Sequence, residues 1–515
     1  MKPNLTRAEF IYSVAGAALA PAALIGSAQS ATTPVTMNTK QSAKAMLPSG
    51  RQPNIVYVVV HDLGRHLGCY GTKVRSPNLD RIATEGARLD NFFCASAVCS
   101  PSRGCAMTGL HAHTNGMVGL AHFGWRFNPG VRTVPEYLRD LGYETTRIGY
   151  SHEGDEGNPL RRYDTDMAVS WRTLRVENAV DSAVAFLKNR SESADKTPFY
   201  LNIGMIETHP SAYLEEVDKY NYNRPGRLHY TYGGPIPEDE VTIPQDMPDN
   251  PAVRSYMAKF EASIRFMDGE VGRLYDQLIK LGYGKDTVFI LTTDHGMNGP
   301  RGKGTLFDHG LSITGLVRLP DSLRKPGAVH TQLLQNIDIL PTLIEVAGGT
   351  PPPHLHGRSF WPLLIGKDYH AHEALFAEWN CGGPAKEYRP VRTVRTAQYR
   401  YIRHLTDTIP HYLLPDEWRS FTPVYPADTK FPNPWPESRL RPPGSLREEL
   451  YDISTDPHLQ QNVAAEQSYA NIKTSLATRL DDWMHTVGDF ALDPNYWPVA
   501  PTKPGFEYIP DGSGR

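Results

Sequence analysis

The stretch Asn54-Ile-Val-Tyr-Val-Val-Val60, followed directly by His61-Asp62, decides how we expect this chain to fold. The stretch is a continuous apolar run, which is typical of a strand buried on both faces of a parallel sheet. The run stops abruptly at two side chains that can bind a metal ion or exchange a proton. The pattern therefore predicts a buried strand with reactive groups just beyond its carboxyl end.

Later segments repeat this arrangement. They are short apolar strands that end at polar residues, and they cover Glu144–Gly149, Pro198–Met205 and Thr287–Thr293. The polar residues that follow them include His152, His209, Asp294 and His295. Helices are expected between the strands, most clearly over about 251–281, where apolar residues are spaced alternately by four and three. Alternating strands and helices predict a mostly parallel sheet flanked by helices, and ligands bind such sheets beyond the carboxyl ends of the strands.

Length and charge narrow the possible classes of protein. The chain has 515 residues and a formal net charge of −3 at pH 7. The length suits one large α/β domain with a smaller one. The near-neutral charge does not favour a general nucleic-acid binder, which needs a strongly basic surface. No apolar run after the first 35 residues approaches the ~20 residues needed to cross a bilayer, so no integral membrane association is expected.

Residues 1–31 have the order of a secretory signal peptide. Lys2 and Arg7 precede an apolar, alanine-rich stretch, and small residues follow up to Ala31. Residues 32–50 are rich in Thr, Ser, Ala and Lys, and we interpret them as a linker. A buried first helix is the alternative for the N-terminus, but the stretch lacks an amphipathic pattern. We therefore predict a periplasmic or secreted protein.

The number of cysteines limits the possible disulfides. The chain contains five, namely Cys69, Cys94, Cys99, Cys105 and Cys381. An odd number in an oxidising compartment leaves at least one thiol unpaired. The other four could form two disulfides in three ways, and the sequence does not choose among them. Because no Cys-x-x-Cys pair is present, a structural zinc site is not expected.

The sequence pattern changes after residue 380. Val391–Arg395 and Tyr399–His404 are short alternating strands, which are typical of an antiparallel sheet with one exposed face. A helix is expected from about 468 to 487. We therefore place a large α/β domain over 51–380 and a smaller α+β subdomain over 381–515.

The element Cys99-Ser-Pro-Ser-Arg103 continues as far as Gly109 in a string that resembles the signature of the sulfatase family. In that family the cysteine is oxidised to formylglycine after synthesis. Similar segments occur along most of the chain, namely Pro53-Asn-Ile-Val56, Pro77-Asn-Leu-Asp80, Gly302-Lys-Gly-Thr305 and Glu449-Leu-Tyr-Asp-Ile-Ser-Thr-Asp-Pro457. The chain looks most similar to sulfamidase-like (heparan N-sulfatase-like) bacterial polysaccharide sulfatases. The resemblance implies an alkaline-phosphatase-like fold, with residues 51–380 as the catalytic domain.

The resemblance also implies catalytic roles. Cys99, converted to formylglycine by a maturase, is expected to attack sulfur through one hydroxyl of its hydrated aldehyde. Arg103 is expected to hold this hydrate by a charge-assisted contact, and His152 to support it. Lys303 and His209 match residues that contact the sulfate, with His209 as the general acid.

The resemblance further implies one divalent cation at the ends of the first and the late strand. Its expected ligands are His61, Asp62, Cys99, Asp294 and His295. Relatives usually have Asp at the position of His61, and imidazole suits manganese or iron better than calcium. Calcium is the first expectation, and manganese or another transition metal is the alternative. His61 could instead lie beside the metal or face the substrate.

These expectations together predict hydrolysis of an O-sulfate ester or an N-sulfate on a sulfated oligo- or polysaccharide. A substrate contact by His113 is weighed equally against a structural role. A phosphodiester or phosphonate monoester hydrolase of the same superfamily is one alternative. A catalytically weak binder of sulfated glycans is another, because His61 and Tyr150 stand where relatives have Asp and Lys. Fold resemblance alone does not identify the sugar.

Overall fold

The computed structural model describes residues 47, 50–153, 162–168, 175–209, 236–245, 247, 249, 251–299, 301–382, 388–406, 448–493 and 495–496. All of these lie in the second of the chain's two units, Ser42–Arg515. The predicted signal peptide over 1–31 and most of the predicted linker over 32–50 lie outside the described residues. In the described part of the chain, the structure contains no helix with the length and apolar character of a membrane span.

The main sheet of the described chain has eight strands in the order β5-β4-β6-β1-β7-β8-β2-β9. Their bounds are β1 Asn54–Val60, β2 Ala87–Leu89, β4 Glu144–Gly149, β5 Thr165–Ala168, β6 Phe199–Gly204, β7 Thr287–Thr293, β8 Gly315–Arg318 and β9 Ala328–His330. Strand β8 is antiparallel to both of its neighbours, and the other strands run in one direction. The prediction of a large, mostly parallel mixed sheet is confirmed.

The strands predicted from apolar runs lie next to one another at the centre of this sheet, as β4-β6-β1-β7. Their register brings the carboxyl ends to one level, because Gly204 pairs with both Gly149 and Val59, and Val60 pairs with Thr293. The polar residues that follow these strands therefore gather at one edge of the sheet.

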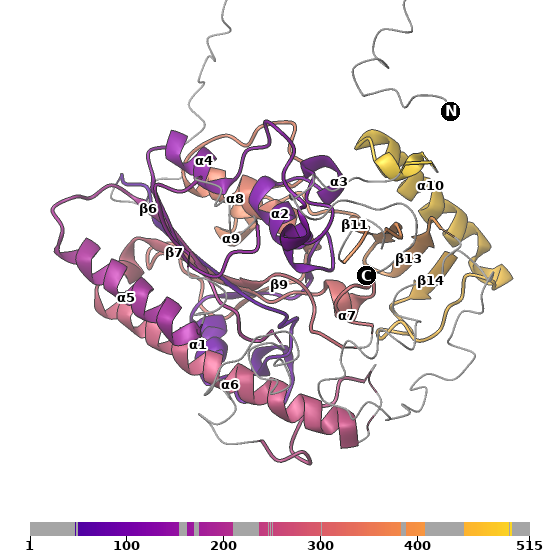
Figure 1. Ribbon diagram of the computed structural model, residues 1–515, viewed down its shortest axis with the longest axis horizontal. Coiled ribbons are helices and arrows are strands. Elements are labelled where there is room, and N and C mark those ends of the chain that lie inside the picture. Colours follow the sequence, from indigo (N-terminus) through magenta and orange to yellow (C-terminus); the bar gives the residue numbers. More distant parts are fainter. Residues whose placement is uncertain are drawn as a thin grey trace, which may run out of the picture. The chain divides into compact units, whose positions relative to one another are not determined.

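Helices cover both faces of the sheet (Figure 1). The side chains of β1 alternate between two cores: Val58 packs with α1, α5 and α6, whereas Tyr57 packs on the side of α4 and α8. The longer helices are α1 Pro77–Glu85, α2 Cys99–Thr108, α4 Val134–Asp140, α5 Val176–Glu192, α6 Pro251–Lys280 and α8 Ile339–Val346. The shorter elements are α3 Ala112–Asn115, α7 Asp308–Leu311, α9 Trp361–Leu364 and the parallel pair β3 Phe92–Phe93 and β10 Leu334–Gln335.

A second, antiparallel sheet follows in the C-terminal part. Its strands are β11 Leu375–Trp379, β12 Val391–Arg395, β13 Tyr399–His404 and β14 Glu448–Asp452, and α10 Ala470–Thr486 packs against them. The sequence predicted β12, β13 and α10 closely. It missed β11, which begins before the proposed boundary at 381, because four of its five residues are buried and no alternating pattern marks it.

A buried ion-pair network fastens this sheet to the segment after α2. Arg392 on β12 is fully buried, and its guanidinium lies 2.5 and 2.9 Å from the two carboxylate oxygens of Asp489. It also lies 3.6 Å from Glu378 on β11. Glu378 in turn accepts hydrogen bonds from the backbone amide of His113 and from Asn380. The network therefore links the C-terminal sheet to the helix α3.

Replacing Arg392 with methionine should destabilise the protein strongly. The change leaves the Asp489 and Glu378 carboxylates buried without their cation, which costs about 3–5 kcal/mol in comparable cases. Replacing Arg479, whose side chain is 40% exposed in its ion pair with Glu373, should cost about 0–1 kcal/mol. Denaturant unfolding of the two variants would measure this difference. Equal losses of stability would contradict the role of Arg392 in compensating the buried carboxylates.

Candidate functional site

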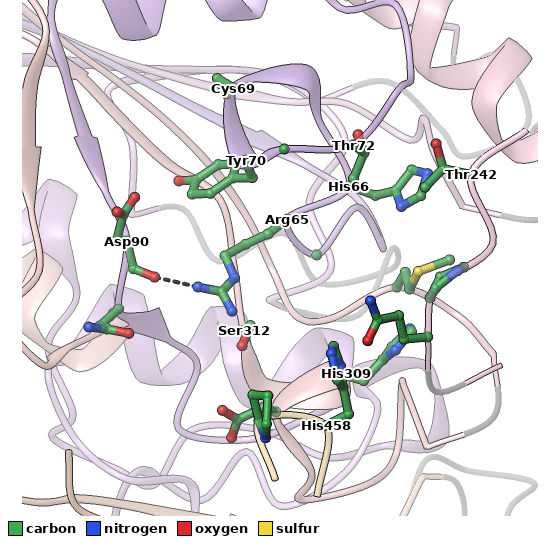
Figure 2. A pocket seen from close by; sticks show the side chains of 18 of the residues that line it. Arg65, His66, Cys69, Tyr70, Thr72, Asp90, Thr242, His309, Ser312 and His458 are labelled. Atoms are coloured by element: carbon green, nitrogen blue, oxygen red, sulfur yellow. Dashed lines mark hydrogen bonds between the residues drawn. The ribbon is translucent and has the colours of Figure 1, made fainter. Parts of the chain in front are cut away.

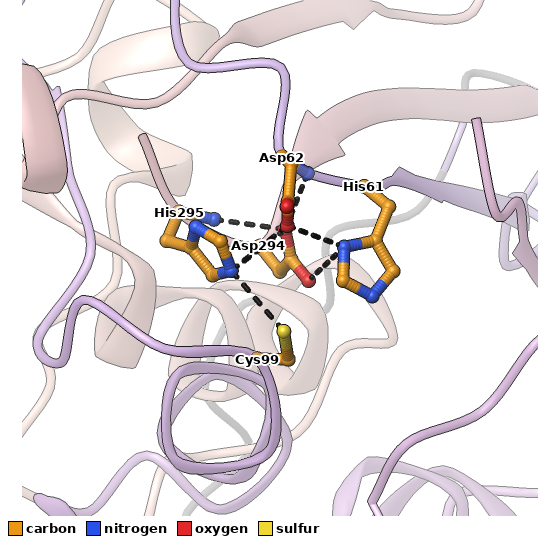
Figure 3. Close-up of side chains that lie close together, drawn as sticks. All are labelled: His61, Asp62, Cys99, Asp294 and His295. Atoms are coloured by element: carbon orange, nitrogen blue, oxygen red, sulfur yellow. Dashed lines mark hydrogen bonds and ion pairs between the residues drawn. The ribbon is translucent and has the colours of Figure 1, made fainter. Parts of the chain in front are cut away.

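Five side chains that can bind a metal ion come together beyond the carboxyl ends of the central strands (Figure 3). They are His61, Asp62, Cys99, Asp294 and His295, called the cluster below. All five are buried, and one ligand atom from each lies within 4.8 Å of the others. These residues come from three distant segments of the sequence, so the fold assembles the set that the sequence analysis predicted.

The register of β1 and β7 brings two of these segments together. Because Val60 pairs with Thr293, the residues that follow each strand lie side by side. Asp62 has a φ of 53°, in the left-handed region that Asp tolerates better than most residues, and its amide donates to Asp294 Oδ1 at 3.0 Å. After His295 only glycine fits, because a Cβ on Gly296 would lie 1.9 Å from the carbonyl oxygen of His309.

The third segment is the start of α2, which begins at Cys99. The Ser102 hydroxyl donates to the backbone carbonyl of Asp294, and Asn336 Nδ2 donates to the carbonyl and hydroxyl oxygens of Ser102 at 3.0 and 2.9 Å. These bonds hold the first turn of the helix against the strand end. As a result the Cys99 sulfur lies 3.3 Å from His295 Nε2.

The five cysteines are all free, so none of the three pairings that the sequence left open occurs. Cys94, Cys105 and Cys381 are buried in three different apolar clusters, which keeps their thiols apart. The Cys99 thiol therefore remains available for modification. Burial by itself would raise its pKa, but the charges of Lys303, His61 and His295 and a hydrogen bond from His152 hold the pKa well below its usual value.

Cationic groups surround the two buried carboxylates of the cluster. Lys303 Nζ lies 2.9 and 3.1 Å from the oxygens of Asp62, and Arg103 Nε lies 3.1 Å from Asp294 Oδ2. His295 Nε2 lies 3.1 Å from Asp62 Oδ1. Burial opposes ionisation of Asp62, yet Lys303, His295 and the other neighbouring imidazoles keep the pKa of its carboxyl well below the usual value.

The charges around the two cluster histidines favour the protonated form of both imidazoles. Burial would lower the pKa of each imidazole, but Asp294, Asp62 and Cys99 together raise both pKa values, that of His295 to about 10. His61 Nε2 is buried and has no hydrogen-bond partner in the described chain. Two carboxylates, two imidazoles and a sulfur are a donor set that fits a divalent cation.

The other predicted catalytic residues adjoin the cluster. His209 Nε2 lies 3.9 Å from Asp62 Oδ2, and its ring centroid is 4.6 Å from that of His61. His152 is among the neighbours that lower the pKa of Cys99, and its Nε2 lies 3.0 Å from Nδ1 of His122. The sequence analysis missed His122, because it follows no strand and belongs to no recognisable motif.

Tyr150 occupies the position where a lysine was expected. Its ring is close to one cluster residue and to Arg103, with 5.3 Å between the centroids of the Tyr150 and His61 rings and 5.4 Å from the Arg103 guanidinium carbon to the Tyr150 centroid. An aromatic face attracts a guanidinium, so Tyr150 supports Arg103 without adding a charge.

His113 lies apart from this group in a buried contact. Its Nδ1 is 3.1 Å from Glu378 Oε1, its side chain is 1% exposed, and Glu378 raises its pKa against the effect of burial. Of the two alternatives from the sequence, these contacts favour the structural one, and a substrate contact stays an untested prediction.

Comparison with known proteins identifies the class. A family model described as Sulfatase matches residues 53–349, which is more than half of the chain, and a second, described as N-sulphoglucosamine sulphohydrolase, C-terminal, matches residues 296–419. The chain therefore belongs to the sulfatase family of hydrolases, as the signature around Cys99 predicted.

The individual relatives described next share less than 30% sequence identity with this chain. An ulvan-active sulfatase of Formosa agariphila is 29% identical over 449 residues, covering 85% of this chain and 81% of that protein. The human N-sulphoglucosamine sulphohydrolase is 27% identical over 464 residues, covering 85% and 91%. A solved structure in complex with its substrate, D-glucosamine-2-N,6-O-disulfate, has a TM-score of 0.62 at 19% identity, covering 86% of this chain and 99% of that one. This last likeness confirms the fold.

Binding of a divalent cation to the cluster should release protons. His295 has a pKa of about 10 without a metal, and only the neutral imidazole is a ligand. Below that pH, affinity should rise about tenfold per pH unit for each proton displaced. Calorimetric titration of calcium and of manganese, in buffers with different protonation enthalpies, would count these protons. An affinity that does not change between pH 6 and 8, roughly the range in which histidine normally titrates, would contradict the predicted release of protons.

Proposed function

We propose that this protein hydrolyses O-sulfate or N-sulfate groups of a sulfated carbohydrate, with a formylglycine made from Cys99 by a maturase and one divalent cation. The observation that carries the proposal is the position of the free Cys99 thiol within the cluster, at the start of α2. Relatives named for ulvan and for N-sulphoglucosamine support a sulfated saccharide as substrate.

The roles of the individual residues are part of the proposal. Formylglycine at position 99 would supply a hydrated aldehyde with two hydroxyls on one carbon. One hydroxyl would attack sulfur, and the other would later expel the sulfate by re-forming the aldehyde, with cleavage of the bond between that carbon and the sulfate oxygen. Arg103 and His152 would hold this hydrate in place. Lys303, with a side chain that is 18% exposed, would pair with the sulfate oxygens when substrate enters.

The cation would be held by the modified residue together with His61, Asp62, Asp294 and His295. It would supply positive charge beside the sulfate. Calcium is the first candidate, and the two imidazoles favour manganese or another transition metal as the alternative. A change of His61 to aspartate would restore the carboxylate that relatives have and should shift the preference towards calcium.

His209 is proposed to donate a proton to the leaving oxygen or nitrogen. Burial and the nearby Lys303 lower its pKa to about 3, so the ring is neutral before substrate binds. The negative charge of a bound sulfate acts in the opposite direction, since it favours the imidazolium. Its side chain is 30% exposed, so solvent can return the proton after each turnover.

The proposed function also suggests a role for each segment of the chain. We propose that residues 1–31 direct export to the periplasm or the medium, and that 32–50 form a linker. Residues 51–380 would form the catalytic domain and 381–515 the C-terminal subdomain, although the sheet of that subdomain already starts at Leu375.

The proposal is tested by expressing the chain with and without a formylglycine-generating maturase. Mass analysis of the peptide that contains Cys99 should show conversion to the aldehyde only with the maturase. Sulfate release from heparan-type and algal oligosaccharides should follow the converted fraction. A Cys99→Ala variant should release none, and a Cys105→Ala variant is the matched control for loss of a neighbouring buried thiol. Full activity of unconverted protein would refute the mechanism, and faster turnover of an aryl phosphodiester than of any sulfate would favour the phosphodiesterase alternative.

Replacing His209 with glutamine should affect substrates according to their leaving group. A sugar hydroxyl leaves poorly without a proton, so kcat should fall about 10²–10⁴-fold for a sulfated disaccharide. A nitrophenolate leaves without a proton, so the loss for nitrophenyl sulfate should be much smaller. Steady-state kinetics on both substrates measures the ratio, and equal losses would assign the general acid to another residue.

A further inference from the structure

A large pocket lies next to the cluster and is not explained by the proposed chemistry (Figure 2). Its volume is about 930 Å³, within the range of small-molecule sites. The same loops build both features: the loop that supplies Asp62 also supplies Gly64 to the pocket wall, and the loop that supplies His295 also supplies Met297. None of the five cluster residues lines the pocket.

The pocket contains a cation that is not matched by an acid. Figure 2 shows the Arg65 guanidinium directed to the backbone carbonyl of Asp90, which accepts its hydrogen bond. In the part of the chain that the structure describes, no carboxylate lies within ion-pair distance of this guanidinium. Burial lowers the pKa of Arg65, whereas Tyr70 and the carboxylates of Asp308 and Asp90 act in the opposite direction. Arg65 is only partly buried, so its guanidinium is available to an anion that enters the pocket.

The two acids of the pocket wall are already neutralised by other arginines. Asp90 pairs with Arg88, whose Nε lies 2.6 Å from Oδ1. Asp308 pairs with Arg400, whose Nε lies 2.7 Å from Oδ1, and with Arg395, whose Nε lies 3.3 Å from Oδ2. Arg65 and Arg88 line the pocket together with Asp90 and Asp308, so guanidinium groups and carboxylates are equal in number there. Because both carboxylates are engaged by other arginines, Arg65 is the arginine of this wall that has no ion pair among the described residues.

Unused hydroxyl groups line the same space. Ser312 Oγ and Thr72 Oγ1 are buried atoms without a hydrogen-bond partner, and Ser312 is only 5% exposed. Both residues line the pocket, as do the aromatic rings of Tyr70 and Phe307. Hydroxyl donors beside aromatic rings and one cation match a polyhydroxylated ligand with an acid group. A single small anion would leave most of this volume unfilled.

We propose that this pocket binds an anionic sugar residue, with its carboxylate or sulfate group on Arg65 and its hydroxyls on Ser312 and Thr72. The choice of a sugar rests on the proposed function, since a sulfated glycan carries such residues in addition to the group that is hydrolysed. The bound sugar would belong either to the same glycan whose sulfate is hydrolysed at the cluster or to a second glycan chain.

The test measures binding rather than turnover, so its result does not depend on sulfatase activity. The full chain is titrated by calorimetry with a hyaluronan tetrasaccharide, which carries carboxylates but no sulfate, and with neutral chitotetraose. We expect binding of the hyaluronan probe alone. Arg65→Gln should weaken it about tenfold or more, because a charge-assisted bidentate contact is lost, and Arg65→Lys should restore part of it.

Two further variants keep the test independent of folding. Ser312→Ala removes a hydroxyl that has no partner in the protein, so its unfolding midpoint should not change while binding weakens about threefold. Arg132→Gln, in an exposed pair with Asp140, should leave binding unchanged. The proposal is overturned if the tetrasaccharide does not bind, if it binds Arg65→Gln as tightly as the unaltered chain, or if only inorganic sulfate binds in an Arg65-dependent way.

Discussion

Two buried carboxylates, Asp62 and Asp294, set the main constraint on this structure. They lie side by side because β1 and β7 end at the same level, and the Asp62 amide donates to the Asp294 side chain. Buried negative charge is costly unless it is compensated. The structure meets this requirement with Lys303 on one carboxylate and Arg103 on the other.

The same constraint explains the state of the histidines and of Cys99. Without a metal, the buried carboxylates favour the protonated forms of His61 and His295, and positive charge on these rings in turn favours the thiolate of Cys99. A donor set of this kind fits a divalent cation, and metal and protons would compete for the same ligand atoms. The helix α2 completes the arrangement, since Ser102 fixes its first turn to the end of β7.

Arginine has two different uses around the site. Arg103 and Arg392 are buried with acidic partners and hold the architecture together. Arg65 lies in a pocket beside the cluster without such a partner. A polysaccharide is long enough to occupy more than one position on an enzyme, so the proposed catalytic role of the cluster and the proposed separate subsite for an anionic group are compatible with one substrate.

The sequence alone determined the central strands, because a strand buried on both faces has to be apolar throughout. The bounds of β1, β4 and β7 follow from their residues, and the motif at Cys99 identified the family. Polar residues directly after such strands gather at one edge of the sheet, so the proximity of His61, Asp62, Asp294 and His295 was also predictable. The family resemblance supplied their expected role as ligands and added Cys99.

Only the tertiary structure decided the contacts between segments that carry no shared pattern. His113 and Glu378 are 265 residues apart, and neither segment contains a pattern that predicts their contact. The pairing of His122 with His152, the absence of disulfides and the unmatched charge of Arg65 likewise depend on which side chains the fold brings within a few ångströms. Local sequence specifies strands and helices through periodicity and burial, whereas such contacts arise from the packing of whole elements, for which a single sequence holds no local signal.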